Sequence, residues 1–248
     1  MGALYFISDV HLGAQPPAEE SAKEARLLDL LEQVGTDGER LYILGDLYDF
    51  WFEYRHVIPI TGLRILAALK GLTEQGVEVH YLAGNHDFAI GSFLSDTIGC
   101  RIHRKPIDME WAGTRFHLRH GDGLAGKDTG YRLMTKVIRS RAAIWLWRLL
   151  HPGLGFAIAN RVSGTSRHYT TGKDFGSGEK THFRLEALAA RDYDYIVMGH
   201  SHVAEESRLD GGSTCINLGS WLGGGAPFAR FGEGRMELTW PGDRPLTL

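Results

Sequence analysis

Five apolar stretches of this chain each end in side chains that can bind metal ions. These side chains are carboxylates, an amide and imidazoles, a mixture that suits Mn²⁺, Fe or Zn²⁺ better than Mg²⁺ or Ca²⁺ alone. Two divalent ions held close together can clamp a phosphoryl group and stabilise charge on its attacking and leaving oxygens. In chain order the residues are Asp9, His11, Asp46, Asn85, His120, His200 and His202. One such motif alone is more often an ordinary turn, but five in succession indicate a two-metal centre.

The elements that precede these residues must be neighbouring strands if the side chains are to meet. Apolar, β-prone runs predict strands at residues 4–7, 41–44, 77–83, 115–119 and 195–198. Helical spacing of apolar residues predicts helices over 25–34 and 63–72, and the polar segment 16–24 is expected to be a loop. This alternation implies a largely parallel α/β core, in which ligands bind beyond the carboxyl ends of the strands. Residues 213–218 and 229–240 are expected to form antiparallel strands separated by glycine-rich turns.

The composition is that of a globular protein of enzyme size. With 248 residues, 43% of them hydrophobic, the chain fits one large domain or one domain with a sizeable insertion. The net charge of -3 argues against wholesale binding of nucleic acid. The chain has 2 cysteines, which favours a reducing compartment, and no signal peptide or membrane-spanning run is evident. We therefore expect a cytoplasmic protein that at most rests on a membrane.

Residues 126–178 interrupt the alternation of strands and helices. Between Thr129 and Lys173 there are eight lysines and arginines and no acidic residue. The apolar residues at helical spacing among them include Leu133, Met134, Val137, Ile138, Ile144, Trp145 and Leu149. These faces could line a pocket for acyl chains while the arginines meet anionic groups; the alternative is an ordinary helical lid with a solvated basic face. We expect a helical cap at 126–178 over a core made of 1–125 and 179–248.

Taken together, the motifs resemble those of the calcineurin-like metallophosphoesterase superfamily. They are Asp9-x-His11, Gly45-Asp46-x-x-Asp49, Gly84-Asn85-His86-Asp87, His120-Gly121-Asp122 and Gly199-His200-x-His202. The resemblance implies an α/β fold, a sandwich of mixed β-sheets flanked by helices, with a helical cap insertion. It also implies a ligand set in which one metal ion is held by Asp9, His11 and His202 and the other by Asn85, His120 and His200, with Asp46 bridging.

His86 is the candidate for direct contact with the reacting phosphate. In the superfamily, a histidine at this place resembles one that contacts substrate phosphate and assists the leaving group; the alternative is a histidine that only caps its turn. The adjacent Asp87 is expected to hold the His86 imidazole in one tautomer, and we assign both residues as catalytic. Asp49 and Asp122 are expected to orient the metal ligands.

Over most of its length the chain resembles the UDP-2,3-diacylglucosamine hydrolases of lipid A biosynthesis. The segments that carry the resemblance are 7–12, 43–51, 84–88, 120–124, 199–202 and 217–221, together with the basic insertion. One departure is His86, because many members have arginine there. The resemblance implies that glucosamine and phosphates are contacted by Asn85, His86, Asp128, Tyr131, Arg161, Ser166, Arg167 and Lys173.

The leading hypothesis is a hydrolase with two divalent ions, Mn²⁺ first, with Fe or Zn²⁺ as alternatives. It would cleave the pyrophosphate of UDP-2,3-diacylglucosamine to 2,3-diacylglucosamine 1-phosphate (lipid X) and UMP. Because the substrate is a nucleotide-linked glycolipid, we expect peripheral association with the inner leaflet of the inner membrane, and no nucleic-acid partner. A phosphoesterase of soluble nucleotides or of another phosphodiester is the alternative. A non-catalytic scaffold of the same fold is disfavoured because all seven ligands are present.

Overall fold

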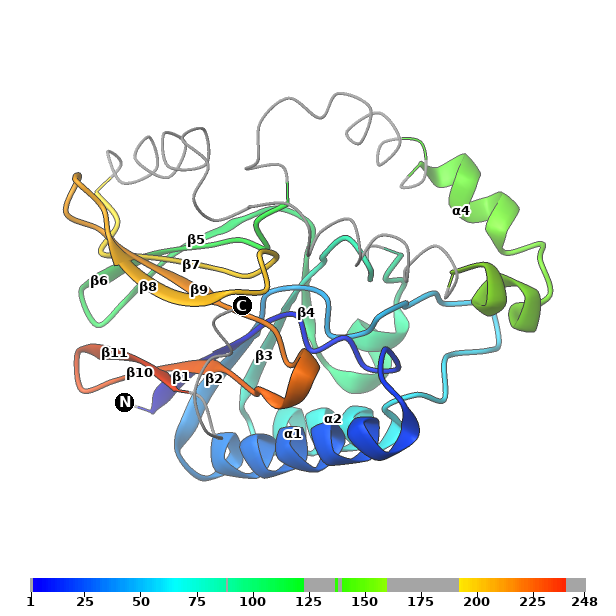
Figure 1. Cartoon of the computed structure of the whole chain (residues 1–248), viewed down its shortest axis with the longest axis horizontal. Helices are drawn as coiled ribbons and strands as arrows, with labels where there is room; N and C mark the ends of the chain where they lie inside the picture. The colour runs from blue at the N-terminus through cyan, green and yellow to red at the C-terminus, as the bar shows by residue number, and fades with distance from the viewer. Residues whose placement is uncertain (1, 88, 123–136, 138–139, 160–191, 240–248) are drawn as a thin grey trace.

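Two β-sheets pack face to face in the computed structural model, which describes residues 2–87, 89–122, 137, 140–159 and 192–239 (Figure 1). The first sheet has the order β11-β10-β1-β2-β3-β4 and the second the order β5-β6-β7-β9-β8. The first contains Ala3–Ile7 (β1), Gly38–Ile43 (β2), Glu78–Leu82 (β3), Arg101–His103 (β4), Phe228–Gly232 (β10) and Arg235–Thr239 (β11). The second contains Ile107–Trp111 (β5), Thr114–Leu118 (β6), Tyr195–Met198 (β7), Ala204–Arg208 (β8) and Thr214–Leu218 (β9).

Both sheets contain parallel and antiparallel strands. Strands β1 to β4 are parallel to one another, whereas β10 and β11 are added in antiparallel fashion beside β1. In the second sheet β6, β7 and β9 are parallel, with β5 and β8 antiparallel to their neighbours. The predicted sandwich of mixed sheets is confirmed. The expectation for residues 213–218 is wrong in part, because β9 is antiparallel to β8 but parallel to β7.

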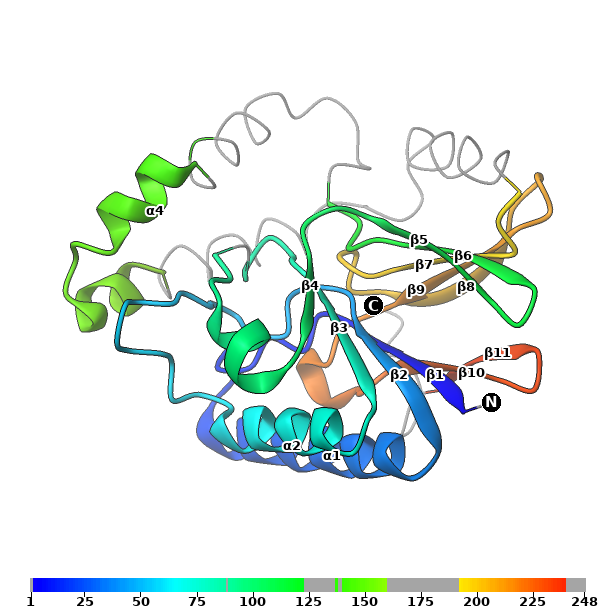
Figure 2. The same ribbon diagram turned by 180° about the vertical axis from the view of Figure 1, so that it is seen from behind.

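Two hydrophobic layers hold the sheets in place. Tyr5 and Ile7 of β1 belong to the layer beneath the helices, and Leu4 and Phe6 belong to the layer between the sheets. Both faces of β1 are buried, which explains why its sequence is apolar without alternation. Figure 2 shows α1 (Pro17–Asp37) and α2 (Leu63–Glu74) side by side on the outer face of the first sheet.

Helix α1 begins earlier than its apolar pattern indicated. The prediction of a loop over 16–24 is wrong, because the helix starts at Pro17, with Glu19 and Glu20 in its first turn. Proline is well tolerated at the first helical position, and carboxylates there interact favourably with the helix dipole. A polar sequence therefore marks the start of this helix.

The described part of residues 126–178 is helical. It contains α4 (Arg141–Trp147), capped by the Ser140 side chain, and a second helical run over 152–159. In Figure 1 α4 lies at the right, on the side of the two sheets toward which β1 runs. The cap and core boundaries stay predictions. Among the described residues, no helix combines the length and apolar character needed to cross a membrane. Short helical turns over Phe93–Ile98 (η1) and Leu222–Gly224 (η2) complete the elements.

Candidate metal centre

Backbone hydrogen bonds join the loops that follow the parallel strands. After β1, the amide of Asp9 donates to the carbonyl of Gly45 (3.1 Å) and that of His11 donates to the carbonyl of Asp46 (3.0 Å). In the second sheet, the amide of Gly199 donates to the carbonyl of His120 (2.9 Å). Pairing thus continues past the ends of the strands and places the predicted ligand loops beside one another.

Most of the predicted metal ligands have a left-handed backbone. The φ angles are 52° at Asp9, 50° at His11, 54° at Asp46, 72° at His200 and 63° at His202. Among the described residues, the other non-glycine positions with positive φ are Ala112, Asp192 and Glu233. This conformation costs a non-glycine residue roughly 1–2 kcal/mol and tends to persist where function requires it. Its concentration at one edge of the sandwich marks that edge as the functional site.

Gly84 and Gly199 allow two carboxylates to approach the backbone closely. A Cβ atom on Gly84 would lie 2.1 Å from Asp46 Oδ1, and one on Gly199 would lie 2.2 Å from Asp9 Oδ2. Real Cβ contacts are never this short, so any larger residue would displace the carboxylate. These glycines are needed for space as much as for turning the chain.

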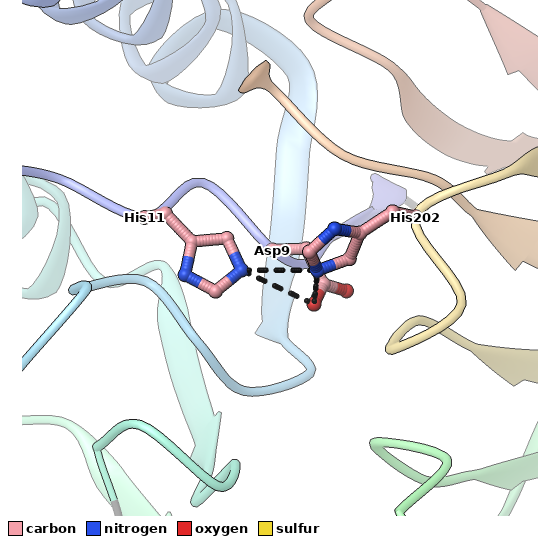
Figure 3. A group of neighbouring side chains, drawn as sticks. All are labelled: Asp9, His11 and His202. Atoms are coloured by element: carbon pink, nitrogen blue, oxygen red, sulfur yellow. Dashed lines mark hydrogen bonds and ion pairs between the residues drawn. The ribbon is translucent and has the colours of Figure 1, made fainter. Parts of the chain in front are cut away.

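Asp9, His11 and His202 form the first group of converging ligand atoms (Figure 3). The Nε2 atoms of the two histidines are 3.2 Å apart and lie 3.6 and 3.4 Å from Asp9 Oδ1. That carboxylate oxygen is buried and has no hydrogen-bond partner among the described residues. Buried polar atoms are normally satisfied, so a carboxylate oxygen that faces two imidazole nitrogens fits a divalent cation.

Asp46 lies between this group and a second one. Its Oδ2 is 4.0 Å from Nε2 of His11 and 3.3 Å from Nε2 of His120. The Nδ1 atom of His120 donates to the carbonyl of Leu44 (2.8 Å), which directs Nε2 toward Asn85 Oδ1, 2.9 Å away. The imidazole of His200 meets that of His120 edge to face, with ring centroids 5.0 Å apart. All seven predicted ligands therefore gather at one rim.

The electrostatics of the rim favour positive charge. Burial would raise the pKa of Asp9 and Asp46, but neighbouring histidines hold both well below the ordinary value. Burial would lower the pKa of His11, but the carboxylates of Asp49 and Asp9 raise it to about 9. Burial likewise opposes the charge of His120, whose pKa the Asp46 carboxylate raises. The carboxylates stabilise the protonated imidazoles. They would equally stabilise divalent cations that replace these protons.

Comparison with known proteins decides the family. The model of the calcineurin-like phosphoesterase family matches residues 3–204. The chain belongs to this family. It is 32% identical to UDP-2,3-diacylglucosamine hydrolase of Porphyromonas gingivalis, over 88% of this chain and 90% of that protein. It is 31% identical to the proteins of that name from Nitrosococcus oceani, over 81% and 78%, and Aeromonas hydrophila subsp. hydrophila, over 94% and 96%.

Family membership confirms the resemblance inferred from the motifs. The chain is a phosphoesterase and therefore a hydrolase. The family and the groups of converging ligand atoms together indicate a centre for divalent metal ions.

His86 and Asp87 have different surroundings in the phosphoesterase site. Nδ1 of His86 lies 2.9 Å from the carbonyl oxygen of Asp49, so this bond fixes its tautomer. The expected contact with Asp87 is not made: that carboxylate accepts hydrogen bonds from the amides of Leu47 and Gly84 and from the hydroxyl of Tyr81. These three donors satisfy the Asp87 carboxylate, which therefore fixes the loops after β2 and β3. Asp49 also lies near His11, with Oδ1 3.5 Å from Nδ1, as expected of an orienting residue.

Sequence reasoning did not identify several residues that fix the ligand loops. Ser8 donates through Oγ to Asp9 Oδ2 (2.7 Å), and the carbonyl of Asp9 accepts from the Trp221 amide (3.1 Å) and Ser220 Oγ (3.2 Å). Ser220 and Trp221 belong to a segment that carried the family resemblance, which was the only signal for them. Ser8 lies in another such segment, 7–12, and directly precedes the ligand Asp9.

An aromatic cluster lies next to Asp49 in the chain. Phe50 and Phe52 contact Trp147 of α4, with ring centroids 6.0 and 6.1 Å apart, and Phe50 also meets Phe156 edge to face at 5.4 Å. On the same helical segment, Trp145 is 59% exposed and Leu149 66% exposed. One face of the segment is thus anchored beside the rim while other apolar side chains face outward.

The predicted cap contacts to substrate lie outside the described residues. They are Asp128, Tyr131, Arg161, Ser166, Arg167 and Lys173. Leu133, Met134 and Ile138 of the predicted acyl-chain surface lie outside as well.

Proposed function

We propose that this phosphoesterase hydrolyses the pyrophosphate of UDP-2,3-diacylglucosamine, giving 2,3-diacylglucosamine 1-phosphate and UMP. The observation that carries the proposal is the similarity to UDP-2,3-diacylglucosamine hydrolases over most of the length of both chains. The bound substrate must present its pyrophosphate at the rim and its acyl chains at an apolar surface. Phe50, which follows Asp49 directly, contacts Trp147, so the segment that carries the apolar surface is anchored beside the rim.

The ligand assignment forms part of this proposal. One divalent ion would be held by Asp9, His11 and His202, and a second by Asn85, His120 and His200, with Asp46 shared. The mixture of imidazole and carboxylate makes Mn²⁺ the first expectation, and Fe or Zn²⁺ the alternatives. When bound, the two ions supply Lewis acidity that stabilises negative charge on the phosphoryl oxygens.

The side chains around the ions would orient the pyrophosphate and stabilise its charge. Because Nδ1 already donates to the carbonyl of Asp49, His86 would donate a hydrogen bond from Nε2 to a phosphate oxygen as the doubly protonated imidazolium. In hydrolysis a water oxygen bonds to phosphorus and the bridging P–O bond breaks, leaving charge on the departing phosphate. A histidine beside that oxygen can stabilise this charge or supply a proton. Asp49 would keep both His11 and His86 in place, with its Oδ1 3.5 and 3.8 Å from their Nδ1 atoms.

The helical segment that contains α4 would receive the acyl chains. Trp145 and Leu149 supply exposed apolar surface, and Arg148, the C-cap of α4, is exposed and basic. Asp128, Tyr131, Arg161, Ser166, Arg167 and Lys173 would contact the glucosamine and phosphates. We extend the proposal to peripheral binding at the inner leaflet of the inner membrane, since the substrate resides in a bilayer. Co-sedimentation with vesicles of anionic phospholipid tests that extension.

Comparing two substrates tests the proposed function. We expect kcat/KM for UDP-2,3-diacylglucosamine to exceed that for UDP-N-acetylglucosamine by several orders of magnitude, because each buried methylene contributes roughly 0.8 kcal/mol. In the double variant Trp145→Ser and Ile144→Ser, the preference should fall through the lipid substrate alone. Activity toward the sugar nucleotide is the internal control, since it reports on the metal centre. Equal turnover of both substrates by the wild type would instead favour a phosphoesterase of soluble nucleotides.

A further inference from the structure

An ion pair on α1, between a fully buried lysine and a partly exposed glutamate, contacts the loop that carries His11. The side chain of Lys23 is fully buried, and its Nζ donates to the carbonyl oxygen of His11 at 2.7 Å. The same Nζ lies 3.1 Å from Oε2 of Glu20, one helical turn earlier. Glu20 in turn accepts hydrogen bonds from the amides of Gly13 (2.8 Å) and Gln15 (3.2 Å). The pair thus touches the loop at three alternate residues.

A fully buried lysine is unusual on the face of a helix that packs against the core. The buried face of α1 is otherwise made of leucines and a valine, and an apolar residue could fill the place of Lys23 without burying a charge. The lysine of α2 shows the ordinary arrangement: Lys70 pairs with Glu74 at 3.3 Å while both side chains remain exposed. The burial of Lys23 is therefore explained by its hydrogen bond to the carbonyl of the predicted ligand His11.

The His11 backbone needs such support. Its φ of 50° is strained for a residue with a Cβ atom. At the other end of the same loop, the carbonyl of Asp9 is held by Trp221 and Ser220, which are neutral donors. Lys23 contributes a charged donor at the His11 end, and charge-assisted hydrogen bonds are stronger than neutral ones. The loop is consequently fixed on both sides of Val10.

We propose that Lys23 and Glu20 are positioning residues that hold the loop from His11 to Gln15, and through it the His11 imidazole, in the geometry required by the metal ion shared with Asp9 and His202. This inference rests on the proposed metal ligands. It does not depend on the identity of the substrate. Neither residue touches the reacting atoms, so both act through His11.

Metal titration of a Lys23→Met variant tests the proposal. Methionine keeps most of the length of the lysine chain and removes its charge. Metal-free protein is titrated with Mn²⁺ while free Mn²⁺ is followed by electron paramagnetic resonance. We expect one of two binding events to weaken by about 10- to 100-fold, the usual effect of losing a group that orients a ligand. The other event, assigned to Asn85, His120 and His200, should change by less than about threefold.

Turnover measured against Mn²⁺ concentration provides a second readout. A positioning role predicts that excess Mn²⁺ restores kcat in the Lys23→Met variant while the half-saturating Mn²⁺ concentration stays raised. Wild-type affinities in both binding events would overturn the proposal. Equal weakening of both events, together with loss of thermal stability, would also overturn it, because that pattern describes a purely structural residue.

Two further variants keep the test decisive. Lys70→Met removes the exposed pair on α2 and should leave Mn²⁺ binding unchanged. If Lys23→Met does not fold, Glu20→Gln replaces it, since glutamine retains an oxygen for the loop amides and removes the charge. We expect a loss of several-fold in the same binding event, and unchanged binding by Glu20→Gln would refute the role. Mn²⁺ binding is measured without substrate, so failure of the substrate proposal and failure of this one are separable.

Discussion

At the scale of single residues, His86 is close enough to the ligands to have two possible roles. Its ligand atom lies within 4.8 Å of those of His11 and Asp46, although it was assigned to the phosphate and not to a metal ion. We expect His86→Ala to lower kcat by roughly 10²- to 10⁴-fold, the range typical of one acid–base or electrostatic group. Metal content, measured by elemental analysis, should be unchanged.

Other outcomes of the His86 experiment have distinct meanings. Loss of one equivalent of metal would make His86 a ligand, and full activity of the alanine variant would reduce it to a turn cap. Recovery of activity in His86→Arg would favour charge stabilisation over proton transfer. His56→Ala is the matched control, because that histidine is exposed and lies outside the motifs.

Residue types and spacing were sufficient to identify the groups that gather at the rim. Asp9, Asp46 and His120 approach one another as their positions after strands implied. The contact predicted between the adjacent residues His86 and Asp87 is wrong, because Asp87 binds two backbone amides and a tyrosine hydroxyl. Lys23 could not be predicted at all, because a lysine in a polar segment is ordinarily exposed and its partner is a backbone carbonyl.

At the scale of elements, alanine substitutions can test whether the glycine at a strand end is required for space, with a glycine inside a helix as the control. We expect Gly84→Ala to abolish metal binding and activity, because the added Cβ would lie 2.1 Å from Asp46 Oδ1 and 2.6 Å from the Asp46 amide. Gly71→Ala on α2 is the control, since its Cβ meets nothing within 4 Å. That variant should gain about 0.5–1 kcal/mol of stability from the higher helix propensity of alanine. Metal analysis and thermal unfolding of both variants provide the comparison. Normal metal content in Gly84→Ala would contradict the packing argument.

The sequence predicts buried strands more readily than exposed ones. β1 and β7 are apolar runs that the sequence marks clearly, whereas β8 is polar, has no fully buried residue and is not predicted by the pattern. The parallel pairing of β9 with β7 was also missed, because a turn-rich C-terminal segment is more often a set of hairpins. Pairing partners depend on the packing of the whole sandwich, which no local pattern specifies.

At the scale of the whole molecule, the rim joins two separate sheets. Asp9, His11, Asp46 and Asn85 follow strands of the first sheet, and His120, His200 and His202 follow strands of the second. Metal ions shared by these residues would link the sheets at one edge of the sandwich. Stability should therefore depend on metal and on pH together.

We expect the metal-free protein to lose stability between pH 6.5 and pH 8.5. The pKa of His11 is raised from 6.5 to about 9, and that of His120 is raised as well. A raised pKa contributes stability that is complete below the ordinary value and is lost as pH rises through the folded-state value. The melting temperature of chelator-treated protein should fall by several degrees over this range, since 1 kcal/mol corresponds to about 2–4 °C for a chain of this size.

The stabilisation that bound metal provides should change with pH in the opposite direction over the same range. Metal ions and protons compete for the same imidazoles, so the stabilisation produced by added Mn²⁺ should grow with pH. A melting temperature of the metal-free protein that stays constant or rises from pH 6.5 to pH 8.5 would contradict the assignment of charge at the rim.

The left-handed backbone of the ligand residues also restricts which mutations evolution can accept there. A β-branched residue at Asp9, His11 or Asp46 would lose the ligand atom and would also be strongly disfavoured by the φ angle. Asparagine tolerates that conformation better than most residues, and glycine tolerates it best. Among replacements of these ligands, asparagine and glycine should therefore disturb the backbone geometry of the rim least.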